Sequence, residues 1–486
     1  MKKLHNLKRI FAFFVAAAVT VSVMSGCGKK ETKTEESDVP VISWYVPSDD
    51  QPDKQVVLAE ANKIIEEKVG ARLDLKFIDY GAFNTRMQML MAGGADFDLC
   101  FTGYLNNYQD AATKGGLMDI TDLIDQEAPK LREIIPDWFL KSSEINGRIY
   151  AIPNIQAVSL PTAVWVPDHV SERTSFKFPE PHTKVSITDF EPYMEEVKAL
   201  GEEIYGFFDL DAFTSDKYEE IVSNIAIKKD GSSMEAFLIY ETPEWIEGVE
   251  KIHEWYKKGY IRPDIATADT GNDQNLGKVG LNVSSWKPGD EINMKNAYGH
   301  STKAYFLSDP YVPIGNVTQT MIGIGRGSKN AEKAIKIIEL MNADKDLYNL
   351  ICFGIEGKHY NVTEEGKCKL IENSGYYPNH QWKYGNNFNA MVLEGMDIDV
   401  YEQTEKMNDE AKKSPLLGFT LDRSKINDWI AQVSSIQGEY PAMNSGYDAP
   451  ENYMDEFKRR MDEAGQRKIL EEVQRQIDEF VSKNKE

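Results

Sequence analysis

Aromatic, amide and acidic side chains gather at the ends of three strand-like segments in the first quarter of the chain. Ligands of open α/β sheets bind beyond the carboxyl ends of the strands. Aromatic rings cover flat apolar faces of a ligand, while amides and carboxylates bond to hydroxyl groups around its rim. The candidate binding residues at these strand ends are Tyr45 and Asp49, Tyr80 and Asn84, and Tyr104 and Asn106.

A later segment, residues 382–388 (WKYGNNF), has the same mixed character in a loop-like setting and adds Trp382 and Asn386 as candidates. Aromatic residues of α/β proteins lie in the core about twice as often as they face a ligand. We therefore expect Trp44, which lies inside a strand, and the tryptophans on helical patterns to pack internally. The latter are Trp138, Trp245, Trp255 and Trp429.

The chain shows no short catalytic motif: Gly-x-Ser-x-Gly, His-Glu-x-x-His and the phosphate-binding loop are all missing. Its seven histidines lack metal-ligand spacing. We therefore expect no catalytic residues, no cofactor and no metal.

Strands and helices alternate from residue 41 onward. Strand patterns at 41–46, 72–78 and 98–101 flank helical patterns at 54–69 and 83–91, and this succession predicts parallel strands. Asn146-Gly147 between two strand-like runs predicts a hairpin. The fold class is therefore α/β.

The first residues predict export and anchoring. Four basic residues precede 14 uncharged residues, 10–23, a run that fits a signal peptide and is too short to span a membrane. Met24-Ser25-Gly26-Cys27 resembles the bacterial lipobox, although Met24 stands where Leu is commoner. That resemblance implies a signal peptide at 1–26, acylation of Cys27 (palmitate-type chains) and a protein anchored on the outer face of the cell membrane. An ordinary secretory signal is the alternative. Residues 27–39 are polar and are expected to form a flexible tether.

The composition of the chain limits the kinds of molecule that it can bind. The chain carries 78 acidic against 55 basic residues, a net charge of −23, which repels nucleic acid and fits a neutral ligand. Its 486 residues exceed one compact core, so two or three domains are expected. Cys100 is expected to be buried, whereas spacing leaves open whether Cys352 and Cys368 pair.

Eight segments then resemble, in order, the extracellular solute-binding proteins of carbohydrate ABC importers. The last two resemble a subgroup of lipoproteins with an extra C-terminal helical domain. These segments are 98–104 (DLCFTGY), 116–121 (GLMDIT), 146–153 (NGRIYAIP), 255–261 (WYKKGYI), 277–281 (GKVGL), 328–334 (SKNAEKA), 354–360 (GIEGKHY) and 414–419 (SPLLGF). In 328–334 Ala331 replaces the usual proline.

This resemblance implies two α/β lobes of the periplasmic-binding-protein type, joined at a hinge around a ligand cleft. The lobes would comprise 40–154 plus 287–342 and 155–286 plus 343–414, followed by a C-terminal helical domain at 415–486. The resemblance also places Tyr104 in a loop that reaches the ligand, Trp165 near the first crossing between lobes and Trp286 after the return crossing.

The function implied is capture of a carbohydrate, in particular an oligosaccharide, by a monomeric protein that delivers it to the permease subunits of the transporter. Two other functions stay open. A surface glycoside hydrolase would need two carboxylates flanking the scissile bond, and a sugar sensor would use the same fold for signalling.

The C-terminal region has helical patterns at 422–436 and 450–483. Ile469, Val473, Ile477 and Phe480 form one apolar stripe that must be buried. We expect these helices to pack on the body of the same chain.

Overall fold

The computed structural model describes residues 39–483, and the predicted signal peptide, most of the tether and Cys27 lie outside that range. Residues 39–486 form one compact unit. Among the described residues no helix is both long and apolar enough to cross a membrane. Cys100, Cys352 and Cys368 are buried free thiols, so the possible Cys352–Cys368 disulfide is not formed.

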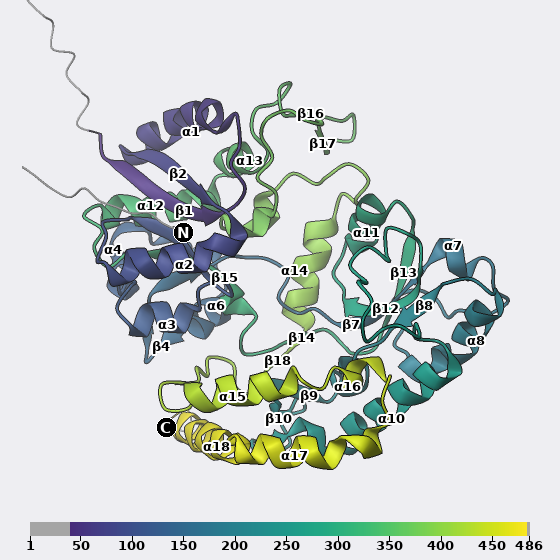
Figure 1. The fold of residues 1–486 in the computed structure, drawn as a ribbon. Helices are drawn as coiled ribbons and strands as arrows, with labels where there is room; N and C mark the ends of the chain where they lie inside the picture. The colour runs from purple at the N-terminus through teal and green to yellow at the C-terminus, as the bar shows by residue number, and fades with distance from the viewer. Residues whose placement is uncertain (1–38, 484–486) are drawn as a thin grey trace, which may run out of the picture. The chain divides into compact units, whose positions relative to one another are not determined.

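The first lobe is built on a five-stranded sheet with the order β2-β1-β3-β15-β6. Figure 1 labels β1, β2 and β15 of this sheet. β1, β2 and β3 are parallel as predicted, whereas β15 runs antiparallel to both β3 and β6. Their bounds are β1 Val41–Pro47, β2 Arg72–Ile78, β3 Leu99–Gly103, β6 Ala151–Pro153 and β15 Thr320–Ile324.

Helices α1 (Lys54–Val69) and α2 (Tyr80–Ala92) connect these parallel strands. α1 ends at Gly70, whose φ of 66° is a left-handed cap. α2 begins three residues before the predicted start because the Asp79 side chain accepts a hydrogen bond from the Gly81 backbone N–H. This earlier start places Tyr80 in the first turn of α2, directly after β2.

Several short elements complete the first lobe. The predicted hairpin is present, with Asn146 and Gly147 at φ of 53° and 75° in its turn. The elements are α3 Tyr108–Thr113, α4 Thr121–Glu127, α5 Lys130–Ile134, α6 Asp137–Ser142, β4 Glu144–Ile145, β5 Arg148–Ile149, α12 Ala331–Ala343, α13 Lys345–Phe353, β16 Tyr360–Val362 and β17 Cys368–Leu370.

The second lobe contains a four-stranded sheet, β13-β7-β12-β8, and a three-stranded sheet, β11-β10-β9. Helices α8, α10 and α11 accompany these sheets. The bounds are β7 Thr162–Pro167, β8 Tyr205–Phe207, β9 Tyr218–Val222, β10 Ile225–Lys228, β11 Phe237–Leu238, β12 Val279–Ser285, β13 Thr302–Phe306, α7 Asp168–Ser171, α8 Glu191–Ala199, α9 Asp211–Thr214, α10 Pro243–Lys258 and α11 Asp290–Tyr298.

Two predicted lobe boundaries were wrong. Residues 287–306 belong to the second lobe, because β13 pairs with β7 along its whole length. Residues 343–393 belong mainly to the first lobe, because α13 follows α12 after a single linking residue and buries Leu347, Tyr348 and Ile351 in the first lobe's core. The crossings between lobes therefore lie near 154–161, 307–319 and 394–414.

These crossings are tied to one another. β14 (Tyr311–Val312) of the second crossing pairs with β18 (Lys412–Lys413) of the third. α14 (Val400–Glu410) presents Asn408, whose side chain accepts from the Val158 N–H at 3.0 Å and donates to the Gln156 carbonyl at 2.7 Å. A shared set of hydrogen bonds thus joins all three crossings.

The C-terminal extension consists of α15 (Asn427–Gln437), α16 (Ala442–Ser445), α17 (Met454–Glu463) and α18 (Gln466–Lys483), drawn in yellow to green tones in Figure 1. The helix predicted over 450–483 is interrupted at Gly465, whose φ is 100°. Ile469, Val473 and Ile477 are fully buried in the same cluster as the core of the second lobe. The predicted packing of the stripe on the body of the chain is therefore confirmed.

Candidate functional site

Four rings gather where the carboxyl ends of the first lobe's strands meet the loop after β17. We call Tyr80, Tyr104, His380 and Trp382 the aromatic platform. The Trp382 ring lies 6.2 Å from Tyr104 and 5.3 Å from His380, and the His380 ring lies 5.8 Å from Tyr80. Tyr104 is 49% exposed, and buried Phe101 lies beneath, edge-on to both Tyr104 and Trp382. The platform offers partly exposed ring surface suited to a flat apolar ligand face.

The loop that carries His380 and Trp382 is tied to the segment after β1. The Ser48 hydroxyl donates to the Pro378 carbonyl at 3.2 Å, and the Tyr377 N–H donates to the Gln51 side chain at 2.8 Å. Asn379 and His380 adopt φ of 51° and 55°, a left-handed conformation that residues other than glycine seldom take. The surrounding hydrogen bonds hold this unfavourable backbone in place.

Lys383 supplies the strongest of these ties. Its ammonium is fully buried and donates to the Pro47 carbonyl at 2.8 Å and the Pro378 carbonyl at 3.0 Å, and it lies 3.5 Å from the Tyr80 hydroxyl. Burial lowers the pKa of Lys383 to about 7, against a smaller opposing effect of Cys352 and Asp49. One buried side chain therefore connects β1, the aromatic loop and Tyr80.

Burial also shifts the pKa values of the platform residues themselves. It raises the pKa of Tyr80 and of Tyr104, so both phenols stay neutral. The pKa of His380 is lowered, first by burial and then by the charges of Lys383 and Lys287. The platform is thus composed of neutral rings near neutral pH.

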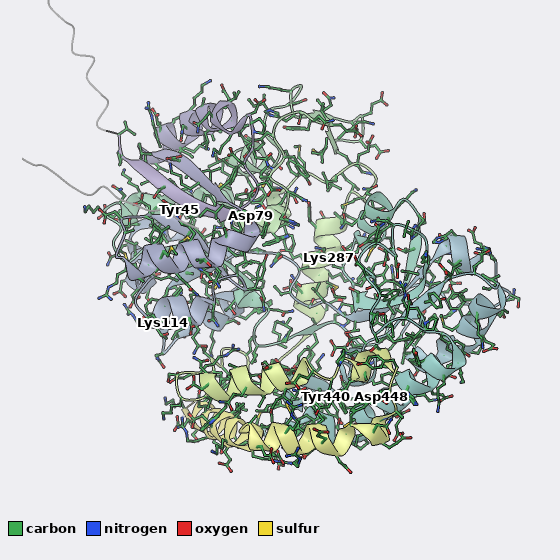
Figure 2. The ribbon with its side chains drawn as sticks, viewed as in Figure 1. Tyr45, Asp79, Lys114, Lys287, Tyr440 and Asp448 are labelled. Atoms are coloured by element: carbon green, nitrogen blue, oxygen red, sulfur yellow. The ribbon has the colours of Figure 1, made fainter. Side chains whose placement is uncertain are left out.

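Lys287 belongs to the second lobe and follows β12 (Figure 2). The positive charge of Lys287 contributes to the lowered pKa of His380 on the first lobe, after burial and the charge of Lys383. Lys287 directly follows Trp286, whose ring nitrogen donates to Glu291 at 2.8 Å and whose ring lies 4.7 Å from His182. Trp286 is 8% exposed. The second lobe therefore carries a buried aromatic residue next to a cationic residue at the end of β12.

The remaining candidates have other surroundings. Tyr45 is partly buried and edge-on to Phe97, and Asn106 is buried, where it accepts from the Gly103 N–H at 3.2 Å. Asp49 and Asn84 are exposed, and the Asn386 side chain accepts from the Phe388 N–H. The prediction for Trp165 was wrong: its ring is 1% exposed and its nitrogen donates to the Ser285 carbonyl inside the second lobe.

Of the predicted residues, Tyr80, Tyr104 and Trp382 lie together, whereas Trp286 belongs to the second lobe. Sequence reasoning missed His380, Lys383 and Lys287. Each lies within two residues of a predicted tryptophan, so the neighbourhood of Trp382 and Trp286 was the available signal.

The chain was compared with known proteins. A domain of unknown function (DUF3502) matches residues 415–482, which is most of the C-terminal extension. A carbohydrate ABC transporter substrate-binding protein of Streptococcus pneumoniae serotype 4 is 28% identical over 99% of this chain and its own whole length.

Solved structures that are similar to this chain are also solute-binding proteins. An N-glycan transport solute binding protein (NgtS) from Streptococcus pneumoniae is 26% identical, covers 92% of this chain and 100% of its own, and has a TM-score of 0.82. The structure of the same protein in complex with Man5GlcNAc covers 92% of this chain and 99% of its own, with a TM-score of 0.70. An extracellular solute-binding protein from Bifidobacterium longum subsp. infantis, 15% identical, shares the fold over 91% of this chain and 98% of its own, with a TM-score of 0.64. The predicted fold class and the predicted resemblance to substrate-binding proteins of carbohydrate ABC transporters are confirmed.

Proposed function

We propose that this chain, a substrate-binding protein of the carbohydrate ABC transporter type, captures a neutral oligosaccharide between its lobes and delivers it to a membrane permease. The observation that carries the proposal is the aromatic platform at the strand ends, with Trp286 and Lys287 on the facing lobe. N-glycan oligosaccharides are the first ligands to test, because the similar streptococcal protein is described in complex with them.

The three crossings are the elements about which the lobes would close on a ligand. The streptococcal structure that is not a glycan complex by name gives a TM-score of 0.82, whereas the two glycan complexes of the same protein give 0.72 and 0.70. The arrangement of this chain is thus nearer to the first form.

The platform binds sugar through its neutral rings and adjoining polar groups. Tyr104 and Trp382 would stack on the apolar faces of sugar rings, and Asp49 and Lys287 would bond to hydroxyl groups. Because the ligand is neutral, affinity should depend little on salt. The protein acts by binding and release as a monomer, and it carries out no chemical step on the sugar.

A glycan array incubated with residues 39–486, which form one compact unit, tests this function. The expected result is retention of a small set of related oligosaccharides. Retention of none, or cleavage of the glycan that is retained, would contradict the proposal, and cleavage would favour the glycoside hydrolase alternative.

Attachment to the membrane is a separate part of the proposal. Cys27 follows an uncharged segment and two small residues, Ser25 and Gly26, as in bacterial lipoproteins. Two acyl chains would hold the protein stably on the outer face, since each buried methylene contributes about 0.8 kcal/mol. Cys27→Ser should release the protein from the membrane fraction or leave it unprocessed, and an unchanged membrane fraction would refute anchoring through Cys27.

A further inference from the structure

A cavity of about 490 Å³ lies between the end of β3, the second crossing and the start of the C-terminal extension. This volume is within the range of ligand-binding pockets. The first lobe contributes Tyr104 and Gln109, the crossing contributes Gln319, and the extension contributes Phe419, Thr420 and Arg423. Tyr104 therefore belongs both to the cavity and to the aromatic platform, so the two adjoin at this residue.

The part of the extension that reaches the cavity, residues 419–423, is held in a fixed position. We call it the wall segment. Gln476 on α18 accepts from the Asp422 N–H at 2.8 Å and donates to the Asp422 carbonyl at 2.9 Å, so both backbone groups are clamped. The buried ring of Phe419 packs edge-on against Phe480 at 5.6 Å. The apolar packing of α18 on the second lobe thus gives the wall segment a rigid support.

Three polar side chains of the cavity lining, those of Arg423, Gln109 and Thr420, have no intramolecular partner among the described residues. Within residues 39–483 neither the Arg423 guanidinium nor the side chains of Gln109 and Thr420 make a hydrogen bond or an ion pair, and Arg423 is only half-exposed. Guanidinium and amide groups donate several hydrogen bonds. Such groups, held beside an aromatic ring, match the hydroxyls and apolar faces of a sugar.

The charge balance of the cavity favours a neutral ligand. Arg423 lies on one wall and Glu220, from β9, lies on another, so opposite charges line the same space. An anion would be repelled by Glu220 and a cation by Arg423. A polar, uncharged molecule fits both.

We infer that the C-terminal extension forms one wall of a second carbohydrate subsite in this cavity, which binds the outer sugars of an oligosaccharide whose other sugars lie on the aromatic platform. This inference rests on the proposed function and assigns a role to the region matched by the domain of unknown function. Tyr104 supplies the exposed apolar surface, and Arg423 and Gln109 donate to hydroxyl groups from opposite walls. The extension thereby sets which oligosaccharide lengths bind well.

Calorimetric titration with two glycans of different length, Man5GlcNAc and Man1GlcNAc, tests the inference. Arg423→Ala should weaken binding of the longer glycan about tenfold, the loss expected for one charged hydrogen bond, and leave the shorter glycan unchanged. Lys425→Ala is the matched control, because Lys425 is an exposed cation two residues away that does not line the cavity. It should bind both glycans as the wild type does.

Gln109→Ala removes a donor from the opposite wall and should produce the same selective loss. Equal melting temperatures of the variants and the wild type establish that the fold is intact, as expected for partly exposed positions. Loss for both glycans alike, or for neither, would overturn the second subsite while leaving the proposed function in place. A wild-type protein that binds neither glycan would refute the assignment of these ligands and the inference with it.

Discussion

Lys383 makes the stability of this protein depend on pH in a way that can be measured. Its pKa falls from the usual 10.5 to about 7 in the folded chain because its ammonium is buried. Between these values the unfolded chain holds a proton that the folded chain has released. The free energy of unfolding must therefore rise as the pH rises from about 7 towards 10.5. The stability gained in this way is lost as the pH falls back to the folded pKa.

The magnitude follows from the two pKa values. Each pH unit between them contributes about 1.4 kcal/mol to the free energy of unfolding. Because Lys383 is about half protonated near pH 7, we expect a gain of about 2 kcal/mol between about pH 7 and about pH 9 from this group alone.

Urea denaturation of wild type and Lys383→Met across this range is the assay. The difference between their two pH profiles isolates the contribution of Lys383, because all other titrating groups are common to both proteins. Lys383→Met should also be less stable near pH 9, since it removes the donor that Lys383 gives to the Pro47 carbonyl, at a cost of about 1–3 kcal/mol, while the Pro378 carbonyl keeps the Ser48 hydroxyl. Lys345→Met, at the exposed start of α13, is the control and should keep the wild-type profile. Parallel profiles for wild type and Lys383→Met would refute the reasoning.

Three further predictions concern the platform, the extension and the hinge. Trp382→Ala should weaken glycan binding by at least about tenfold in calorimetry, because a stacked aromatic ring contributes about 1 kcal/mol beyond its buried area. Ile477→Ala should lower the free energy of unfolding in urea by about 2–5 kcal/mol, because Ile477 is fully buried between α18 and the second lobe. Gly103→Ala should destabilise the chain by more than the roughly 1 kcal/mol expected for Gly94→Ala, measured in the same way. A Cβ at Gly103 would lie 2.0 Å from the Gln319 carbonyl oxygen, whereas Gly94 at φ of 60° has open space around it.

Each of these three predictions would be contradicted by a different experimental result. Wild-type affinity in Trp382→Ala would remove that ring from the ligand site. Wild-type stability in Ile477→Ala would show that α18 is not packed on the second lobe. Equal losses for the two glycine variants would show that the second crossing does not press against the end of β3.

Much of the fold could be predicted from sequence because local patterns determine it. The alternating segments over 41–101 have strong strand and helix periodicities. The apolar stripe on α18 needs a large apolar surface to cover it, and the core of the second lobe supplies that surface. The lobe boundaries could not be predicted because they depend on long-range strand pairing, such as that of β13 with β7. No local pattern of Thr302–Phe306 distinguishes one sheet from the other.

The candidate site was predicted only in part for a similar reason. Tyr80 and Tyr104 follow strand ends, so the general rule for α/β sheets found them. Trp165 fails because it is buried in an apolar cluster with Ala163, Trp286 and Ala304 on the single sheet that contains β7, β12 and β13. One-residue changes in register exchange the two faces of a strand. Lys383 could not be found because a buried lysine is rare, and its partners, the carbonyls of Pro47 and Pro378, leave no trace in residue type.

The most direct test of the central claim is calorimetric titration of residues 39–486 with Man5GlcNAc at low and at high salt, with the glycan recovered and analysed afterwards. The account predicts saturable binding with one glycan per chain, nearly equal affinity at both salt concentrations, and recovery of the glycan intact. Absence of binding to this and every other oligosaccharide tried, a steep loss of affinity with salt, or a shortened glycan would contradict it.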